Sequence, residues 1–244
     1  MTSNSSIGTQ PRRERSSAST VRLFSAAPDL ADFLTLDERA EAERIELPTV
    51  TLSGPVKLSE LLQGANAFAA LVVDGMLLRE LRLGEQPSLR IFGPGELVAT
   101  GVTPTSALPA RSEWRAAEPT HLAMLGIEFL AGAHRWPRLV AGLQARMADG
   151  VERLAVQMAI CQQPRVQDRI LAMLWLLAES WGRVTPAGTL LPLALTHETL
   201  GALVGARRPT VTLALRELTE RGALIHERVG WLLLEAPPTP PETD

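Results

Sequence analysis

The chain has 244 residues, of which 45% are hydrophobic and 21% charged, and its formal net charge at pH 7 is −3. This length leaves room for two small domains. No apolar run is long enough to cross a membrane and the N-terminus lacks the apolar stretch of a signal peptide, so we expect a cytoplasmic protein without membrane contact. The single cysteine, Cys161, excludes an intrachain disulfide and any all-cysteine metal or iron–sulfur site within one chain.

The first 20 residues are rich in Ser, Thr, Arg and Gln and contain few apolar residues. Such a composition cannot offset the entropy lost on ordering, so we predict a disordered tail over residues 1–20. From Pro28 to Arg44 the spacing of apolar residues predicts helix.

Short β-like runs punctuated by Gly and Pro follow, at Glu46–Leu52, Ala67–Val73, Met76–Leu83, Ser88–Phe92, Glu113–Ala117 and Thr120–Leu125. Asp74-Gly75 between two apolar runs is typical of a type I′ hairpin turn. Many short strands at this spacing favour a sandwich or a barrel. We therefore predict a β-rich domain over residues 21–135.

A long helix is predicted over residues 136–163, between Pro137 and Pro164. Its apolar residues recur at spacings of three or four, at Val140, Leu143, Met147, Val151, Leu154, Met158 and Cys161. This pattern is close to a coiled-coil seam and predicts a homodimer, with the first six of these residues at the interface. Gly142 and Gly150 each cost about 1 kcal/mol relative to alanine, so the helix needs a packing partner. The alternative is that the stripe packs against its own β-rich domain, and we expect Cys161 to be a small core residue.

Residues 164–236 are predicted to form a second domain, which opens with an amphipathic helix over Val166–Trp181 and continues with a loop and a short strand. The proline-rich residues 237–244 are predicted to be a disordered stub. Within the domain, Thr196 can cap a helix that runs to Val204, and Gly205 stands where the chain must leave that helix with positive φ. A second helix begins near Arg207, with Pro209 tolerated in its first turn.

The second helix has a predicted buried side and a predicted exposed side. Val211, Ala214, Leu215 and Leu218 fall on the buried side. The opposite side suits phosphates, base edges and thymine methyls, so we predict DNA contacts at His197, Arg207, Arg208, Pro209, Thr210, Thr212, Leu213 and Arg216. Gly222 ends the helix, and the apolar runs Ala223–Ile225 and Val229–Leu234 make a β-hairpin. The plainer alternative is a helical hairpin whose arginines form a solvated face.

Charge gives this prediction little support. Between His197 and Arg228 there are five arginines and four glutamates. Phosphate contact therefore depends on a few placed residues rather than on a basic domain.

The segment from Thr196 to Leu218 resembles the helix-turn-helix of the Crp/Fnr family of bacterial transcription regulators. The resemblance implies an α+β fold with an N-terminal β-roll of the cyclic-nucleotide-binding, double-stranded β-helix or jelly-roll type, a long dimerisation helix and a C-terminal winged helix-turn-helix. It also implies a sequence-specific transcription regulator that binds double-stranded DNA as a dimer and contacts RNA polymerase. The family usually has Arg-Glu where this chain has Arg208-Pro209, and many relatives carry arginine where it has Leu213, which implies a different operator.

The effector is left open by the sequence. In the family, a Gly-Glu-Leu stretch followed by Arg-Ser or Arg-Thr holds a cyclic nucleotide, whereas here Glu96-Leu97 leads into Val98, Ala99 and a proline-rich stretch. Glu96, Arg111 and Ser112 are the candidate effector residues. We expect no cyclic nucleotide, because a buried phosphate without a matched donor set is costly.

Other cofactors are not expected either. The cysteine count excludes an iron–sulfur cluster. Haem would need an axial ligand, and the N-terminal half offers only His121 and His134, which have no supporting pattern.

A second hypothesis is a small-molecule sensor whose winged helix mediates protein contacts. An enzyme is not expected, because the sequence has no paired carboxylates, nucleophile–base constellation, metal-ligand spacing or phosphate loop.

Overall fold

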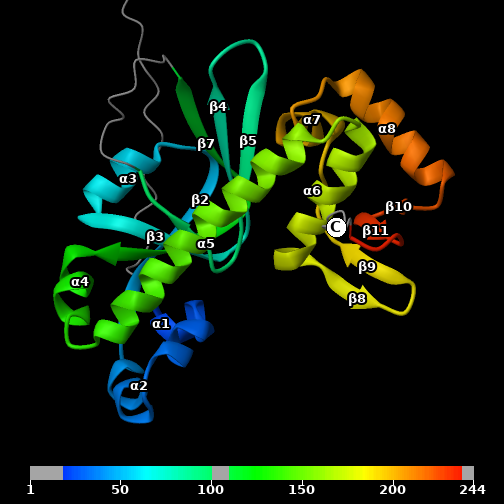
Figure 1. Cartoon of the computed structure of the whole chain (residues 1–244). Coiled ribbons are helices and arrows are strands. Elements are labelled where there is room, and N and C mark those ends of the chain that lie inside the picture. Colours follow the sequence, from blue (N-terminus) through cyan, green and yellow to red (C-terminus); the bar gives the residue numbers. More distant parts are fainter. Residues whose placement is uncertain (1–18, 101–109, 238–244) are drawn as a thin grey trace, which may run out of the picture.

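The computed structural model describes residues 19–100 and 110–237, and it has the mixed α+β architecture that the sequence predicts (Figure 1). The expected tail and stub lie almost wholly outside these residues. The exceptions are Pro237 and two tail residues, Ser19 and Thr20, which belong to strand β1 (Ser19–Arg22) and pair with the next strand. The tail prediction was wrong for those two residues, because a neighbouring strand edge supplies their backbone partners.

The N-terminal domain combines a β-roll with short helices. Its further elements are α1 (Leu23–Ala26), η1 (Pro28–Phe33), α2 (Leu36–Ala42), β2 (Glu46–Val56), α3 (Leu58–Gly64), β3 (Ala67–Asp74), β4 (Leu77–Arg82), β5 (Pro87–Phe92), β6 (Leu97–Val98), β7 (Arg111–Gly126) and α4 (Ile127–Ala133). The helix predicted over Pro28–Arg44 is thus divided into η1 and α2, and Thr35 caps α2 with a capping box that Glu38 completes. Helices α3 and α4 were not predicted.

Strand β7 organises the sheet. It is one strand where the sequence predicted two, and β2 pairs along one of its edges from Thr49↔Ala123 to Val56↔Trp114. Along the other edge, β3 pairs with the end of β7 and β4 pairs with its beginning. Apolar side chains fill the space between the strands and under the helices, in two clusters that meet at β3 and β7.

The hairpin predicted at Asp74-Gly75 was wrong, because β3 and β4 pair with successive stretches of β7 and not with each other. Gly75 has a φ of +89°, and a Cβ there would lie 2.6 Å from the carbonyl oxygen of Pro119. The buried hydroxyl of Thr120 accepts a hydrogen bond from the Met76 amide over 3.1 Å. Asp74-Gly75 is therefore a corner at which the chain crosses close over β7.

The long helix α5 (Pro137–Gln162) runs from α4 to the C-terminal domain, along the sheet (Figure 1). Its first third packs against η1, where a Cβ on Gly142 would lie 2.9 Å from the Phe33 ring. Leu143 is buried in this N-terminal core and Val140 packs against the same cluster. The prediction that Leu143 faces a second chain was therefore wrong, because this side chain is covered within the single chain. Val140 is only half-buried, so its place at the interface stays a prediction.

The rest of the predicted stripe is open to solvent in the single chain. The exposed fractions are 54% for Met147, 68% for Val151, 42% for Leu154 and 63% for Met158. These four residues form the α5 stripe.

The C-terminal domain contains α6 (Val166–Trp181), β8 (Arg183–Thr185), β9 (Gly188–Leu191), α7 (His197–Val204), α8 (Arg208–Glu220), β10 (Leu224–Glu227) and β11 (Gly230–Leu233). Its four-stranded sheet has the order β10-β11-β9-β8. The core of this domain also takes in Leu78, Leu89 and Ile91 from β4 and β5. The tip of the β-roll and the C-terminal domain therefore share one apolar cluster, and β5 lies beside α7 (Figure 1).

Candidate functional site

The turn between α7 and α8 has the geometry that the sequence predicts. The hydroxyl of Thr196 caps α7 by accepting a hydrogen bond from the Thr199 amide over 3.0 Å. Gly205 adopts the left-handed conformation, with φ 66° and ψ 39°. Sequence reasoning missed Gly201, whose missing side chain lets the Ala206 carbonyl oxygen approach, since a Cβ there would lie 2.5 Å from it. Glycine four residues before the turn glycine is the signal that could have indicated this contact.

Helix α8 presents the predicted side to solvent. Val211, Ala214, Leu215 and Leu218 are buried in the domain core. Of the predicted DNA contacts, His197 is half-buried and the others are exposed, namely Arg207, Arg208, Pro209, Thr210, Thr212, Leu213 and Arg216. Leu213 is 56% exposed, so its apolar side chain is available to a partner on this face.

Three polar contacts on this face were not predicted. Nδ1 of His197 lies 2.9 Å from the hydroxyl of Thr212, and that hydroxyl donates to the Arg208 carbonyl oxygen over 3.0 Å. Since the hydroxyl has one proton, His197 donates to it through Nδ1–H, which leaves Nε2 free to meet a ligand. Arg216 donates to Glu220 one turn later over 2.7 Å, and this pair raises the pKa of the guanidinium further.

The wing is the hairpin of β10 and β11. Its register runs from Leu224↔Leu233 to Glu227↔Gly230, so Arg228 and Val229 form the turn. Both turn residues are exposed, and His226 packs edge-on against the ring of Trp231.

A cavity of about 520 Å³ lies between the β5–β6 turn, α5 and the N-terminal segment. It is lined by Ser25–Asp29, Val73, Arg90, Pro94–Leu97, Arg146, Asp149, Gly150 and Arg153. Three guanidiniums and three carboxylates are therefore gathered around one hollow. Of the candidate effector residues, only Glu96 lines it.

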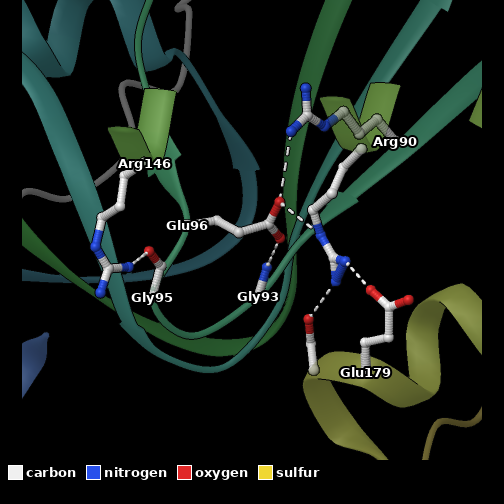
Figure 2. A network of polar contacts seen from close by, with 8 residues as sticks. Arg90, Gly93, Gly95, Glu96, Arg146 and Glu179 are labelled. Carbon is white, nitrogen blue, oxygen red and sulfur yellow. Dashed lines mark hydrogen bonds and ion pairs between the residues drawn. The ribbon is translucent and has the colours of Figure 1, made fainter. Parts of the chain in front are cut away.

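Glu96 is held from several sides (Figure 2). The amide of Gly93 donates to its carboxylate over 2.7 Å, and Nη2 of Arg90 lies 3.4 Å from the other oxygen. The side chain of Glu96 is 16% exposed, so the carboxylate has exchanged most of its water for these partners.

Arg111 and Ser112 lie elsewhere in the roll. They pair with Arg82 and Leu81 of β4 at the beginning of β7. The hydroxyl of Ser112 accepts a hydrogen bond from Arg79 over 3.1 Å. The structure does not bring them to Glu96, because β7 starts at the end of the roll far from the β5–β6 turn.

Arg146 closes one side of the cavity. Its guanidinium donates to the carbonyl oxygen of Gly95 and to the carboxylate of Asp29, and the first of these bonds is drawn in Figure 2. Its Nε is buried and has no acceptor among the described residues. The side chain is 12% exposed, so this donor is a candidate contact for a ligand with acceptor oxygens.

A polar seam joins α5 to both domains. Gln157 donates through Nε2 to the carbonyl oxygens of Leu89 in β5, over 2.7 Å, and of Leu203 in α7, over 3.2 Å. One turn later the thiol of Cys161 lies 3.5 Å from the same Leu203 oxygen. Burial raises the pKa of this half-buried thiol, and the charge of Arg169 opposes the shift.

Over residues 19–100 and 110–237, no helix is both long and apolar enough to cross a membrane. The described part of the chain holds no group of three or more His, Cys, Asp or Glu side chains placed to bind a metal ion. His121 and His134 stand outside the lining of the cavity.

Known proteins resemble this chain in sequence over its C-terminal domain and in fold over most of its length. Residues 168–237 match the family model of the Crp-like helix-turn-helix domain. No curated protein matches the sequence.

Three solved structures illustrate the likeness of the whole chain. A variant of CooA from Carboxydothermus hydrogenoformans is 19% identical, with a TM-score of 0.59 over 77% of this chain and 83% of that one. FixK2 from Bradyrhizobium japonicum is 17% identical, with a TM-score of 0.57 over 77% and 92%. A transcriptional regulator of the CRP family from Thermus thermophilus is 19% identical, with a TM-score of 0.52 over 78% and 89%. At these identities, what the chains share is the fold.

Proposed function

We propose that this protein, a DNA-binding transcription regulator of the Crp/Fnr type, contacts its operator through the exposed face of α8 and controls that contact through the cavity beside Glu96. The proposed DNA contact is supported by one observation. The helix-turn-helix presents a solvent-facing row of side chains, formed by Arg208, Thr212 and Arg216. This row can enter a major groove without disturbing the buried side of the helix.

The two arginines of α8 have different roles in this proposal. They lie eight residues apart, so both can face DNA but cannot touch the same base pair. Arg208 is at the helix N-terminus that enters the groove and is the better candidate for a bidentate guanine contact. Arg216 lies more than two turns farther along α8, away from the end that enters the groove, and is the candidate for a contact with phosphate. Leu213 and Pro209 are apolar and favour thymine through its methyl group.

The experiment begins with genomic footprinting of the purified protein, which supplies the operator. Arg208→Ala is then expected to weaken operator binding by about 1 to 3 kcal/mol and to relax preference at one base pair. Arg216→Ala is expected to weaken operator and random DNA alike and to reduce the salt slope by about one. Arg183→Ala, an exposed arginine of β8 away from α8, is the matched control and should change neither. Indistinguishable effects of the two α8 variants would contradict the assignment.

The cavity supports an effector role for the β-roll. Its volume is within the range of small-molecule sites, and its arginines and carboxylates can fix the orientation of a polar ligand. A screen by thermal unfolding tests this, because a ligand stabilises the fold by RT ln(1 + [L]/Kd). Cyclic AMP and cyclic GMP are expected to give no shift, since Arg111 and Ser112 do not reach the hollow. A micromolar dissociation constant for either nucleotide in calorimetry would overturn that expectation.

The remaining features of the proposed function follow from this role. The protein acts in the cytoplasm as a homodimer through the α5 stripe, which places two copies of α8 on one face of the DNA. RNA polymerase is the proposed second partner. We assign no reaction to the chain.

A further inference from the structure

Three side chains form a wall between the cavity and the C-terminal domain. Arg90, Glu96 and Arg153 line the large cavity on one side. The same three residues line a second, narrow crevice of about 30 Å³, whose other wall includes Leu177 and Trp181 of α6. A change in this wall on the cavity side is therefore also a change in what α6 packs against.

Arg153 makes polar contacts on both sides of the wall. Toward the cavity its Nε lies 3.9 Å from the carboxylate of Glu96. Toward α6 it donates from Nη1 to Glu179 and from Nη2 to the hydroxyl of Ser180, both over 2.8 Å. Figure 2 shows the carboxylate of Glu96 in contact with the Gly93 amide and with guanidinium groups. Because a guanidinium is a planar fork, it cannot keep both bonds to α6 while turning the same two nitrogens into the cavity.

The last turn of α6 is seated on the turn that holds Glu96. A Cβ on Gly93 would lie 2.2 Å from the ring of Trp181, so this indole occupies the space that a side chain would fill. Gly93 is also the amide donor to Glu96. The cavity wall and the seat of Trp181 are thus the same short segment of backbone.

On the basis of the proposed effector role of the cavity, we propose that Arg153 is the positioning residue that couples the cavity to the DNA-binding domain. The ligand in this proposal is a small anion with carboxylate or phosphate oxygens. Such an anion takes the guanidinium of Arg153 from Glu179 and Ser180, and the last turn of α6 is released from the β5–β6 turn. Glu96 remains neutralised by Arg90 and the Gly93 amide when Arg153 leaves. The unpartnered Nε of Arg146 supplies a further donor to the anion.

In the test, a carboxylate side chain introduced by substitution takes the place of the anion in the cavity. Gly150 lines the cavity, and a Cβ there would lie 3.5 Å from Nη2 of Arg90, an ordinary contact. Gly150→Glu therefore offers a carboxylate to the arginines, and Gly150→Gln is the neutral variant of the same shape. Both replace a helical glycine, so neither is expected to unfold α5.

The measurement is amide hydrogen exchange at residues 178–181, without DNA. Gly150→Glu and Arg153→Gln are each expected to raise exchange about two- to fivefold, the range for ion pairs near the surface. Gly150→Gln should stay at the wild-type rate. In the Arg153→Gln background, Gly150→Glu should add nothing. Arg138→Gln, which removes an exposed ion pair elsewhere on α5, is the control for loss of any helix arginine.

The outcomes separate this coupling from the proposed function. If Gly150→Glu leaves residues 178–181 unchanged, or if it still acts without Arg153, the coupling role of Arg153 is wrong. If exchange follows the expectation but Arg208→Ala leaves operator affinity intact, the coupling stands and the DNA contact must be reassigned.

Discussion

Replacing Leu154 with glutamate tests the α5 stripe as the dimer interface. Each stripe side chain is roughly half-exposed in the single chain. Full burial of such a side chain contributes about 1.5 to 3 kcal/mol, so covering the exposed half contributes about 1 kcal/mol each and about 8 kcal/mol over two copies. This is comparable to the 4 to 15 kcal/mol that association costs in lost freedom, so single changes in the stripe weigh heavily.

Leu154→Glu removes about 2 kcal/mol of burial over the two copies and places two like charges in the dimer interface. The total of about 3 kcal/mol or more raises the dimer dissociation constant at least about 100-fold. Sedimentation velocity over a concentration series measures this. Val156→Glu is the matched control, since Val156 is 38% exposed and lies on the side of α5 opposite to Leu154 and Met158. A monomeric wild-type protein at micromolar concentration, or equal effects of the two variants, would refute the reasoning.

Three further outcomes are expected. Gly205→Ala should cost about 1 kcal/mol, measured by urea unfolding, because the site has open space but a left-handed backbone, and Gly205→Asn should cost less. Cys161 should react with iodoacetamide more slowly at pH 7.5 than a free thiol, since burial raises its pKa, and urea should remove the difference. The hydrogen bond from the Thr35 amide holds the pKa of Glu38 below its ordinary 4.5, so its stabilisation is present above that pH and is lost as the pH falls through the folded pKa. The free energy of unfolding of Glu38→Gln should therefore differ more from wild type at pH 6 than at pH 3.

The helix-turn-helix could be predicted because its determinants are local. Thr196 needs an amide three residues away, and Gly205 needs only its own backbone freedom. The buried and exposed sides of α8 follow from a period of 3.6 residues. Sequence reasoning was reliable where a residue and its partner lie within one turn of helix.

The predictions failed where contact with a segment distant in the sequence determines the local structure. Periodicity identified Leu143 as apolar-facing but could not tell that η1, rather than a second chain, covers it. Asp74-Gly75 fits a hairpin locally, and only the approach of Pro119 makes it a corner. The contacts of Glu96 with Arg90 and Arg153 depend on the fold that brings β5 and α5 together, so the sequence indicated one residue of the cavity and none of its arginines.

In the proposed dimer, α5 connects the effector cavity of each copy to the interface between the two copies. The α5 stripe and the side of α5 that carries Arg153 and Gln157 are separated by roughly a third of a turn of one helix. In the proposed dimer, a roll of α5 that follows a change at Arg153 would also turn Val151 and Leu154 against the second copy. In that dimer, occupation of one proposed effector cavity would alter the affinity of the other, because both copies would share one interface. A dimer built in this way would respond to such an effector with positive or negative cooperativity. The packing of a single helix pair would then set how steeply the response rises with effector concentration.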